Sequence, residues 1–482
     1  MTRSPTPIAG WGGVPREPCR VVHPADAAAV AVTAAADASL IARGLGRAYG
    51  DSAMNAHGSV AQSDRLDRFR SFDPATGMLE CESGVSFADV IDCFLQRGWF
   101  LPTTPGTKFV TVGGAIAADV HGKNHHRVGS FGNFVEEITL VVGDGSVVRC
   151  SRNHDPELFF ATLGGMGLTG MILAARFRLV PVETAWITVR HRRTANLDDT
   201  LTVFHESDAS CQHSVAWIDC MARGERLGRS VVMQGNHAKL ADLEARQALA
   251  PLHLPRKRTK TVPLTPPVSL LSPLTVRAFN GIFYAAHADE EKLVDLDAFF
   301  YPLDAVLHWN RVYGPRGFVQ YQAFFPRESS AVGLRRLLDC VAAAGAASFL
   351  AVLKSCGAAD GGVLSYLEPG HTLALDMPYH PARTPALCRQ LDRILLDHGG
   401  RLYLAKDAMT DAETFRAMYP RLQEFQAIKR RVDPHARFVS SQALRVGIVN
   451  RPQRNSQPRS PLPHAPDTNA YPATKELVHH DA

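Results

Sequence analysis

Glycine-rich stretches recur through the first third of this chain and constrain its fold more than any other feature. The first, "ARGLGRAYGDSAMN" (42–55), places Gly44, Gly46 and Gly50 around Arg47 and Tyr49. Glycine at this density indicates a backbone that turns tightly or lets another group approach closely. That group could be a phosphate, a flavin ring or a neighbouring strand, and the stretch alone does not decide between them.

The second stretch, "PGTKFVTVGGAIAADVHGKNHHRVGSFGN" (105–133), places Gly113 and Gly114 before a run of small residues. A double glycine before a helix offers backbone N–H groups to an anion, and the plainer interpretation is a turn before a tightly packed helix. His121, His125 and His126 follow. A His-x3-His pair without a carboxylate partner is a weak metal signal, so we predict no metal site.

A third stretch, "GMGLTG" (165–170), matches the GxGxxG pattern of dinucleotide-binding loops. That pattern binds a pyrophosphate when a strand precedes it and a helix follows. Here the order is reversed. "HDPELFFATLGG" predicts a preceding helix with Asp155 as N-cap and Pro156 at its first position, and "MILAARFRLVPV" then alternates like a strand. A standard Rossmann NAD site is therefore not expected.

Composition narrows the class of protein. The 482 residues are 45% hydrophobic and 21% charged with a formal charge of +5, which indicates a soluble globular chain and gives no support for a nucleic-acid partner. Nine cysteines without a CxxC pair indicate reduced thiols. No apolar run reaches the roughly 18 residues of a membrane span. We expect a cytoplasmic protein, and peripheral contact with the inner membrane stays open.

The pattern of expected strands and helices changes along the chain, and these changes predict its domains. Residues 1–185 alternate short strands with helices, and residues 186–398 form a second domain with longer strands. Six prolines in 250–274 predict a mobile loop at 250–275 that carries Arg256, Lys257, Arg258 and Lys260. Residues 399–446 are expected to return to the first domain, beginning with the strand-like run "RLYLAK" (401–406), which contains Lys406. The polar, proline-rich residues 447–482 predict a disordered tail.

The ordered glycine-rich series resembles the PCMH-type FAD-binding domain of the vanillyl-alcohol-oxidase superfamily. Five later segments are similar to the oxidase subunits of decaprenylphosphoryl-ribose 2'-epimerases: "WNRVYGPRGFVQYQ" (309–322), "SFLAVLK" (348–354), "LALDMP" (373–378), "GGRLYLAKDAMT" (399–410) and "FRAMYPRLQEF" (415–425). The similarity spans roughly residues 10–445. It implies an α+β fold, in which a two-subdomain FAD-binding domain joins a substrate domain built on an antiparallel sheet.

The resemblance implies that FAD is the cofactor and that the first two glycine stretches hold its pyrophosphate. Many relatives carry a histidine after the GxG that bonds covalently to the flavin. Arg47 stands there, and no cysteine lies between Cys93 and Cys150 to form the other known link, so we expect non-covalent FAD. The implied cofactor-binding residues are Arg43, Gly44, Leu45, Gly46, Arg47, Ala48, Tyr49, Gly50, Asp51, Gly106, Thr107, Thr111, Gly113, Gly114, Ala117, Ala118, His121, Gly122, Asn124, Gly170, Ile172 and Tyr403.

Oxidation of an alcohol by a flavin requires a base for the hydroxyl proton and a cation near the ring. The resemblance implies Lys406 and His121 as catalytic residues, with Lys406 as the cation or proton carrier. The implied substrate pocket is formed by Tyr49, Lys123, Tyr313, Gln320, Gln322, Lys354, Asp376 and Lys406. Ala374 and Thr372 stand where the family pattern has cysteine and asparagine, so this pocket is altered.

The function implied is FAD-dependent oxidation of a secondary alcohol of a sugar. The first candidate substrate is the 2'-hydroxyl of a polyprenylphosphoryl pentose, whose phosphate would meet Lys354 and the basic loop. A separate NADH-dependent short-chain reductase would complete the epimerisation. Two alternatives remain: an aldonolactone or alditol oxidase of the same superfamily, and a flavin-binding or lipid-surface protein without turnover.

Overall fold

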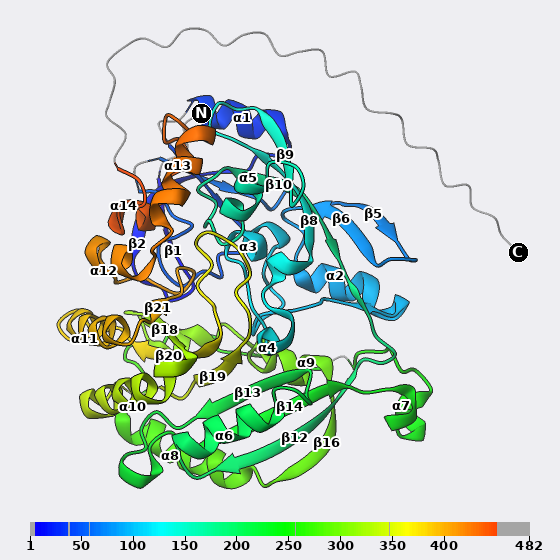
Figure 1. Cartoon of the computed structure of the whole chain (residues 1–482), viewed down its shortest axis with the longest axis vertical. Helices are drawn as coiled ribbons and strands as arrows, with labels where there is room; N and C mark the ends of the chain where they lie inside the picture. The colour runs from blue at the N-terminus through cyan, green and yellow to red at the C-terminus, as the bar shows by residue number, and fades with distance from the viewer. Residues whose placement is uncertain (1–4, 37–38, 57, 256, 347, 451–482) are drawn as a thin grey trace, which may run out of the picture. The chain divides into compact units, whose positions relative to one another are not determined.

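The computed structural model describes residues 5–36, 39–56, 58–255, 257–346 and 348–450. Its N-terminal part holds two larger sheets and a two-stranded one (Figure 1). The first has the order β1 (Thr6–Ala9), β2 (Arg16–Val22), β4 (Ser59–Gln62), β3 (Leu40–Arg43), with β2 and β3 parallel to β4. The second is antiparallel, in the order β5 (Phe69–Asp73), β6 (Met78–Glu82), β10 (Met171–Arg178), β8 (Val135–Val141), β9 (Val147–Ser151).

Short helices connect these strands, and their ends follow from local sequence. In α2 (Phe87–Phe94), Ser86 and Asp89 form a capping box, and Phe87, Val90, Ile91 and Phe94 present one buried face. The other elements of this part are α1 (Ala27–Ala36), η1 (Leu95–Arg97), β7 (Trp99–Phe100), α3 (Val112–Ala117), α4 (His125–Val128), η2 (Phe131–Phe134), α5 (Pro156–Thr162) and β11 (Val180–Pro181), which pairs with β7.

The order of elements around "GMGLTG" is as predicted. Asp155 caps α5, with Pro156 at its first position, and β10 follows the glycines. The prediction for Gly113 and Gly114 was wrong in one respect. The helix α3 begins at Val112, because the Thr111 side chain accepts a hydrogen bond from Gly114 N–H, so both glycines lie in its first turn.

The second part is built on one eight-stranded antiparallel sheet, with the order β16 (Glu290–Asp295), β12 (Trp186–Thr194), β14 (Ser230–His237), β13 (His213–Ile218), β19 (Ala351–Cys356), β20 (Gly370–Pro378), β18 (Phe318–Pro326), β21 (Arg401–Leu402). Together with the two N-terminal sheets it confirms the predicted α+β fold class. Its helices are α6 (Leu197–Ser207), α8 (Pro273–Ala286), α9 (Leu296–Phe300), α10 (Arg327–Ala344) and α11 (Thr384–Asp397).

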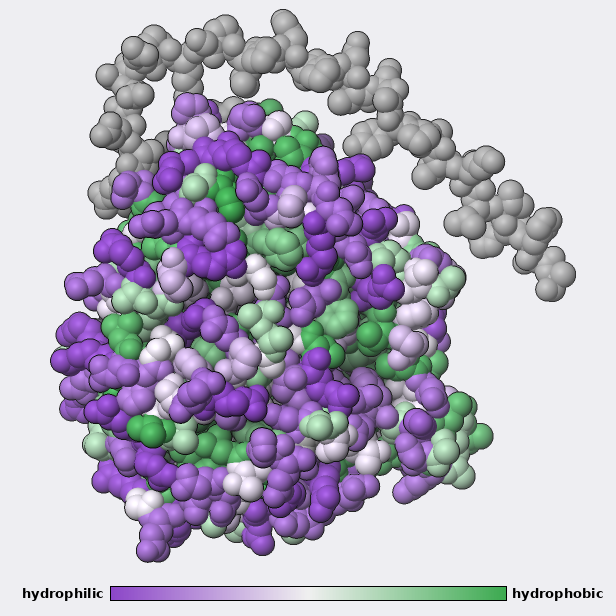
Figure 2. All heavy atoms as spheres, viewed as in Figure 1, coloured by the Kyte–Doolittle hydropathy of each residue, from purple (hydrophilic) through white to green (hydrophobic). Residues whose placement is uncertain are grey.

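Smaller elements surround this sheet: η3 (Gly224–Arg226), η4 (Leu240–Asp242), α7 (Ala245–Ala248), β15 (Lys260–Thr261), η5 (Pro302–Ala305), β17 (Val306–Leu307) and η6 (Trp309–Tyr313). The predicted loop 250–275 contains β15, which pairs with β17, and the start of α8, so part of it is regular structure. Arg256 of the basic group lies outside the described residues. Figure 2 shows a largely hydrophilic face, with apolar side chains gathered over α7 at its lower right edge.

The C-terminal segment carries α12 (Ala412–Met418), α13 (Leu422–Val432) and α14 (Ser441–Arg445), and it packs on the first domain. Val439 N–H donates to Leu40 O (2.8 Å) and Gly143 N–H to Val432 O (3.0 Å). Two boundaries differ from the prediction. Because β21 pairs with β18, the substrate sheet extends to Leu402 rather than ending at 398. Ile448 and Val449 are buried, so the predicted tail at 447 starts too early.

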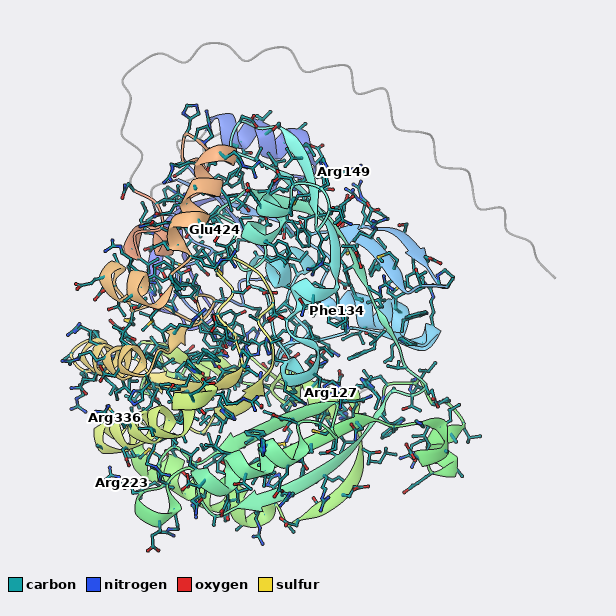
Figure 3. All side chains as sticks on the ribbon, viewed as in Figure 1. Arg127, Phe134, Arg149, Arg223, Arg336 and Glu424 are labelled. Atoms are coloured by element: carbon teal, nitrogen blue, oxygen red, sulfur yellow. The ribbon has the colours of Figure 1, made fainter. Side chains whose placement is uncertain are left out.

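Side chains also connect the first domain to the sheet. Arg127, on α4, lies where the helix meets the second part in Figure 3, and its Nη1 donates to Ala209 O at 3.0 Å. Lys108 of the first domain forms an ion pair with Asp297 of α9 at 2.9 Å. These contacts hold the second glycine-rich stretch (105–133) against the second domain.

Candidate active site

A cavity of about 730 Å³ lies where the glycine-rich stretches meet the eight-stranded sheet, a size typical of a ligand site. Of the implied cofactor-binding residues, it is lined by Arg43, Gly44, Leu45, Gly46, Arg47, Ala48, Tyr49, Gly106, Thr107, Thr111, Gly113, Gly114, Ala117, Ala118, His121, Gly170, Ile172 and Tyr403. Of the implied substrate residues, Tyr49, Lys123, Gln320, Gln322, Lys354 and Lys406 line it. Residues from six separate segments therefore meet at one site.

The loop 44–48 forms a cradle of backbone N–H groups at this cavity. A Cβ atom on Gly44 would lie 2.3 Å from Thr111 Oγ1, and Gly46 has a φ of +67° with the Arg43 guanidinium packed against it. In the described part of the chain, no residue accepts a hydrogen bond from the N–H groups of 45–48. Unpaired N–H groups in a glycine loop suit a pyrophosphate.

Buried side-chain atoms at the cavity that lack a hydrogen-bond partner among the described residues include Arg47 Nε, Ser83 Oγ and His121 Nδ1. Buried polar groups are normally hydrogen-bonded, so these atoms indicate a polar ligand. The Arg47 guanidinium stacks on Trp11, 4.1 Å from the ring centroid. The residues present thus fit FAD. Sequence reasoning missed Trp11 and Ser83, since neither stands in a glycine-rich motif.

His121 is neutral, and its Nδ1–H group is a hydrogen-bond donor. Its pKa is held well below its usual value, first by burial and then by the charge of Lys354. Its Nε2 lies 3.0 Å from Gln322 Nε2 and 3.1 Å from the Tyr366 hydroxyl. The Gln322 amide nitrogen only donates, so His121 Nε2 accepts and Nδ1 carries the hydrogen. Tyr366, another residue that the sequence reasoning missed, stacks on Tyr403 at 4.4 Å.

Three lysines give the cavity a charge that titrates near neutrality. Burial lowers the pKa of Lys406 to about 7, with Asp376 opposing this shift and Lys354 adding to it. Burial likewise lowers the pKa of Lys123 to about 7 and that of Lys354 to about 8. The Lys406 ammonium lies 3.8 Å from the centroid of the Tyr49 ring, a cation–π contact.

Asp376 and Tyr313 do not line the cavity but lie behind the residues that do. Both are almost fully buried, and the Gln320 amide donates to Asp376 Oδ1. Burial raises the pKa of Asp376 to about 7, while the Gln320 hydrogen bond, the charge of Lys406 and Tyr313 lower it. Asp376 therefore acts on the cavity through Lys406 and Gln320.

Four implied cofactor residues support the wall from outside the cavity. Asp51 forms an ion pair with Arg445 at 2.7 Å, and Gly50 packs against Asp407 O. Asn124 donates to Pro102 O and accepts from Thr103, against which Gly122 also packs.

The prediction that Lys406 lies in a strand was wrong. After the two-residue β21 the chain turns, and Lys406 N–H donates to Tyr403 O at 2.9 Å. This turn directs the chain away from the edge of the sheet and leaves Lys406 on the wall of the cavity.

Neither a cluster of metal ligands nor a membrane-spanning helix is found among the described residues. His125 does meet a carboxylate, Asp360, at 2.9 Å, but no group of three or more potential metal ligands forms there. No helix within the described ranges is both long and apolar enough to cross a membrane.

Comparisons with known proteins agree with this geometry. Residues 19–151 match the model of an FAD binding domain, and residues 324–446 match that of D-arabinono-1,4-lactone oxidase. Decaprenylphosphoryl-beta-D-ribose oxidase of Mycolicibacterium smegmatis is 38% identical over 451 residues, which cover 92% of this chain and 97% of the relative.

Two further relatives show how far the likeness extends. An uncharacterized protein in the mprA 5' region of Streptomyces coelicolor is 34% identical over 73% of this chain and 97% of its own. Cytokinin dehydrogenase 5 of Oryza sativa is 33% identical over 36% of this chain and 35% of its own. The chain binds FAD and belongs to the family of FAD-dependent oxidoreductases that includes decaprenylphosphoryl-beta-D-ribose oxidase.

Proposed function

We propose that this FAD-dependent oxidoreductase oxidises the 2'-hydroxyl of a polyprenylphosphoryl pentose, as the oxidase half of an epimerase. One observation carries the proposal: a single cavity joins a glycine cradle, three lysines and an apolar wall. These three surfaces match the cofactor, the phosphate and the isoprenoid chain. The name of the Mycolicibacterium smegmatis relative supports the same substrate.

Loop 43–49, the first turn of α3 and Gly170 would hold FAD, which supplies the two-electron oxidation when bound. The chain's own residues handle the proton. With a pKa near 7, Lys406 is partly an uncharged amine at neutral pH, so its Nζ can accept the proton of a sugar hydroxyl. Asp376 then stabilises the resulting ammonium.

Lys354 is the candidate partner of the phosphate. It lies on β19 at the cavity, and it keeps its charge up to a pH of about 8. Lys123 carries less charge at neutral pH and already donates to Phe299 O. A lysine ammonium recognises phosphate as a point charge.

The apolar wall runs between the sheet and α8. Val215, Trp217 and Met233 line it from the sheet, and Phe279 and Phe283 line it from α8. Trp217 and Phe283 pack with ring centroids 4.5 Å apart. An isoprenoid chain gains about 0.8 kcal/mol for each buried CH₂ on such a surface.

Anaerobic flavin reduction tests the proposal. Purified yellow protein is mixed with decaprenylphosphoryl ribose, with an aldonolactone and with an alditol, and loss of the oxidised flavin absorbance is followed. We expect bleaching with the lipid-linked ribose. Bleaching only with the lactone or alditol would instead support the second candidate, which the match of residues 324–446 favours. Adding NADH together with an NADH-dependent short-chain reductase should then reduce the oxidised pentose to its 2'-epimer.

We also propose that the protein works at a membrane surface. Leu274 and Ile282 are 77% and 71% exposed and lie on one face of α8, and Leu264 and Val268 are 78% and 68% exposed just before it. Lys257, Arg258 and Lys260 precede them. Apolar side chains beside basic ones favour an anionic lipid surface. Phe279 of the same helix lines the cavity, which would place its apolar wall next to the lipid.

Vesicle sedimentation tests the membrane contact. Leu274→Asp with Ile282→Asp should weaken binding to anionic vesicles while FAD content stays unchanged. Leu249→Asp, at an 87% exposed leucine beyond α7, is the matched control and should bind as the wild type does. Equal binding by all three proteins would remove α8 from the proposal.

A further inference from the structure

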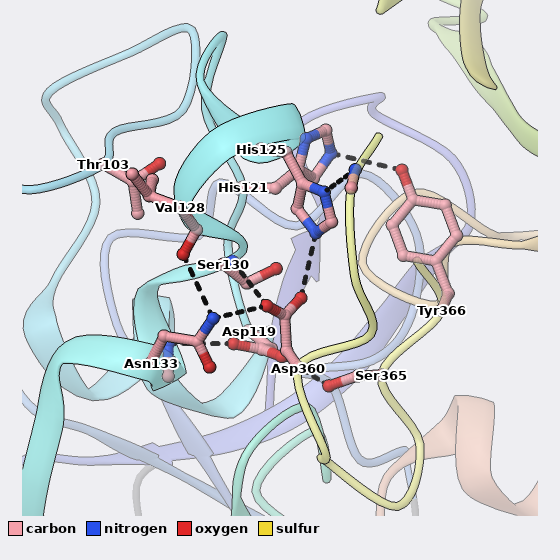
Figure 4. A network of polar contacts seen from close by, with 12 residues as sticks. Thr103, Asp119, His121, His125, Val128, Ser130, Asn133, Asp360, Ser365 and Tyr366 are labelled. Atoms are coloured by element: carbon pink, nitrogen blue, oxygen red, sulfur yellow. Dashed lines mark hydrogen bonds and ion pairs between the residues drawn. The ribbon is translucent and has the colours of Figure 1, made fainter. Parts of the chain in front are cut away.

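A buried polar network lies outside the cavity and joins the loop 357–369 to the flavin-binding domain (Figure 4). At its centre, the Asp360 carboxylate accepts hydrogen bonds from His125 Nε2 (2.9 Å), Ser130 N–H (2.8 Å) and Asn133 Nδ2 (2.9 Å). The side chains of His125 and Asp360 are fully buried. None of these residues touches the cavity, so the network is not part of the wall that meets FAD or the substrate.

The network fixes the hydrogen on His125. Gly357 N–H donates to His125 Nδ1 at 3.2 Å, so Nδ1 must carry the lone pair. The hydrogen is then on Nε2, where it meets Asp360. The imidazole thus uses both nitrogens to tie the loop at two points, Gly357 and Asp360. A Cβ on Gly357 would lie 2.7 Å from His126 O, which shows how closely the loop packs there.

A second set of hydrogen bonds holds the same loop at Ser365, five residues after Asp360. Ser365 donates its hydroxyl to Asp119, whose other carboxylate oxygen accepts from Gly132 N–H at 3.0 Å. Asp119 has a φ of +42°, a conformation that is unusual for a residue with a side chain. The adjacent residue, Tyr366, then places its hydroxyl 3.1 Å from His121 Nε2.

Tyr366 connects this loop to the wall of the cavity. Tyr366 accepts from Gln322 Nε2 (2.6 Å) and lies 3.0 Å from Thr372 Oγ1, and both Gln322 and Thr372 line the cavity. Tyr366 and Gln322 both meet His121 Nε2, which leaves Nδ1 as the ring nitrogen without a partner among the described residues. The contacts of His125, Asp360 and Asp119 hold residues 357–365, which lead directly into Tyr366.

We propose that His125 and Asp360 are positioning residues for the oxidation, which hold the loop 357–366 so that Tyr366 fixes the orientation of His121 at the cavity. Neither residue transfers a proton to the substrate. The pair acts through hydrogen bonds alone, so a side chain that keeps the donor toward Asp360 can replace the imidazole. The kinetic part of the proposal rests on the oxidation proposed above, whereas the position of His121 is a property of the protein itself.

Two substitutions at one position separate positioning from proton transfer. His125→Gln keeps an N–H donor toward Asp360 but cannot titrate, and His125→Leu removes the donor. We expect His125→Leu to slow flavin reduction by about 10- to 100-fold per bound FAD, since a small displacement near reacting groups costs on this order. His125→Gln should stay within threefold of the wild type with an unchanged pH profile.

The ring nitrogens of His121 give a second measurement that needs no substrate. In protein labelled with ¹⁵N-histidine, the His121 signals, assigned with a His121→Asn variant, should report hydrogen on Nδ1 in the wild type and in His125→Gln, and should shift in His125→Leu. Asp433→Asn is the control, because Asp433 is also a buried, ion-paired carboxylate but lies in the C-terminal segment. It should lower the melting temperature and leave both His121 and the reduction rate unchanged.

Three results would overturn the proposal. The first is unchanged His121 signals in His125→Leu. The second is equal loss of rate in His125→Gln and His125→Leu with an altered pH profile, which would assign proton transfer to His125. The third is a loss of rate in Asp433→Asn as large as in His125→Leu, which would mean that only general stability is measured. If the wild type oxidises no lipid-linked sugar, the proposed function fails while the His121 signals still decide this inference.

Discussion

At the scale of single residues, burial lowers the pKa values of the cavity lysines toward neutrality, and residue type alone does not reveal this. In the sequence Lys406 is one of many lysines, and only its place in a family motif singled it out. In the structure its ammonium lies over the Tyr49 ring and its pKa falls to about 7, because the cavity removes water from it. No pattern in the sequence reports such a shift, since Tyr49, Lys354 and Asp376 come from distant segments.

Replacing Lys406 should separate binding from reaction. Lys406→Met keeps the volume and loses the amine, so we expect FAD to stay bound while flavin reduction slows on the order of 100- to 1000-fold, the usual cost of losing one preorganised polar group. Lys406→Arg should rescue only in part, since a planar guanidinium cannot occupy the same point. Stopped-flow reduction measures both. A rate for Lys406→Met within threefold of wild type would remove Lys406 from the reaction.

Lys354 should make substrate binding depend on pH. Its pKa is lowered to about 8, so its ammonium is present below that pH and is lost above it. A phosphodiester keeps its own charge over this range, so the KM for a phosphorylated substrate should rise as the pH goes from 7 to 9. In Lys354→Met the KM should be high and nearly independent of pH. A wild-type KM that falls over this range would contradict phosphate binding by Lys354.

Arg47 should leave the flavin free of any covalent bond. It stacks on Trp11 and stands where many relatives have the histidine that bonds to the flavin. Arginine is not a nucleophile under these conditions, because it stays protonated. Acid precipitation should therefore release all yellow colour into the supernatant. Flavin fluorescence on the denatured band of a gel would show a covalent link elsewhere.

At the scale of elements, sequence reasoning did well where capping residues mark an end and less well where tertiary packing sets it. Asp155 and Pro156 predicted the start of α5, and the alternation after Gly170 predicted β10. The strand expected to carry Lys406 is only two residues long, because β21 pairs with β18 at the edge of the sheet and then turns. Edge pairing of this kind depends on residues about eighty positions away.

The glycine cradle depends on one contact between two elements. Gly44 follows β3, and a Cβ on it would lie 2.3 Å from Thr111 Oγ1, which caps α3. Thr111 cannot move aside without losing its bond to Gly114 N–H, worth about 1 kcal/mol. Gly44→Ala should therefore weaken FAD binding at least tenfold, measured by titration of apoprotein. Gly281→Ala, where a Cβ on α8 meets nothing within 4 Å, should bind FAD as the wild type does.

At the scale of the whole molecule, the glycine motifs predicted which segments meet but not what lies between them. Most residues of the cradle and the lysine cluster were named from the sequence, because family motifs mark them. The network around Asp360 was not, because His125 and Asp119 stand more than two hundred residues before their partners Asp360 and Ser365, which carry no motif. Buried polar contacts between domains are set by packing, which periodicity does not reveal.

The C-terminal end of the described residues gives a last test of how burial contributes to stability. Ile448 and Val449 are 2% and 9% exposed, and Gln426 donates to the carbonyl oxygens of Gly447 and Ile448. Truncation after Val446 should cost about 1.5–3 kcal/mol for each lost buried side chain and lower the melting temperature by several degrees.

Truncation after Asn450 is the matched variant. It keeps both buried residues and removes only 451–482, a polar and proline-rich segment with little apolar surface to bury. FAD content and melting temperature should therefore match those of the full chain. If the chain that ends at Asn450 also melts several degrees lower than the full chain, residues beyond 450 contribute to folding. The boundary drawn from the composition would then be wrong. If the two truncations melt together at the full-chain temperature, Ile448 and Val449 contribute nothing despite their burial.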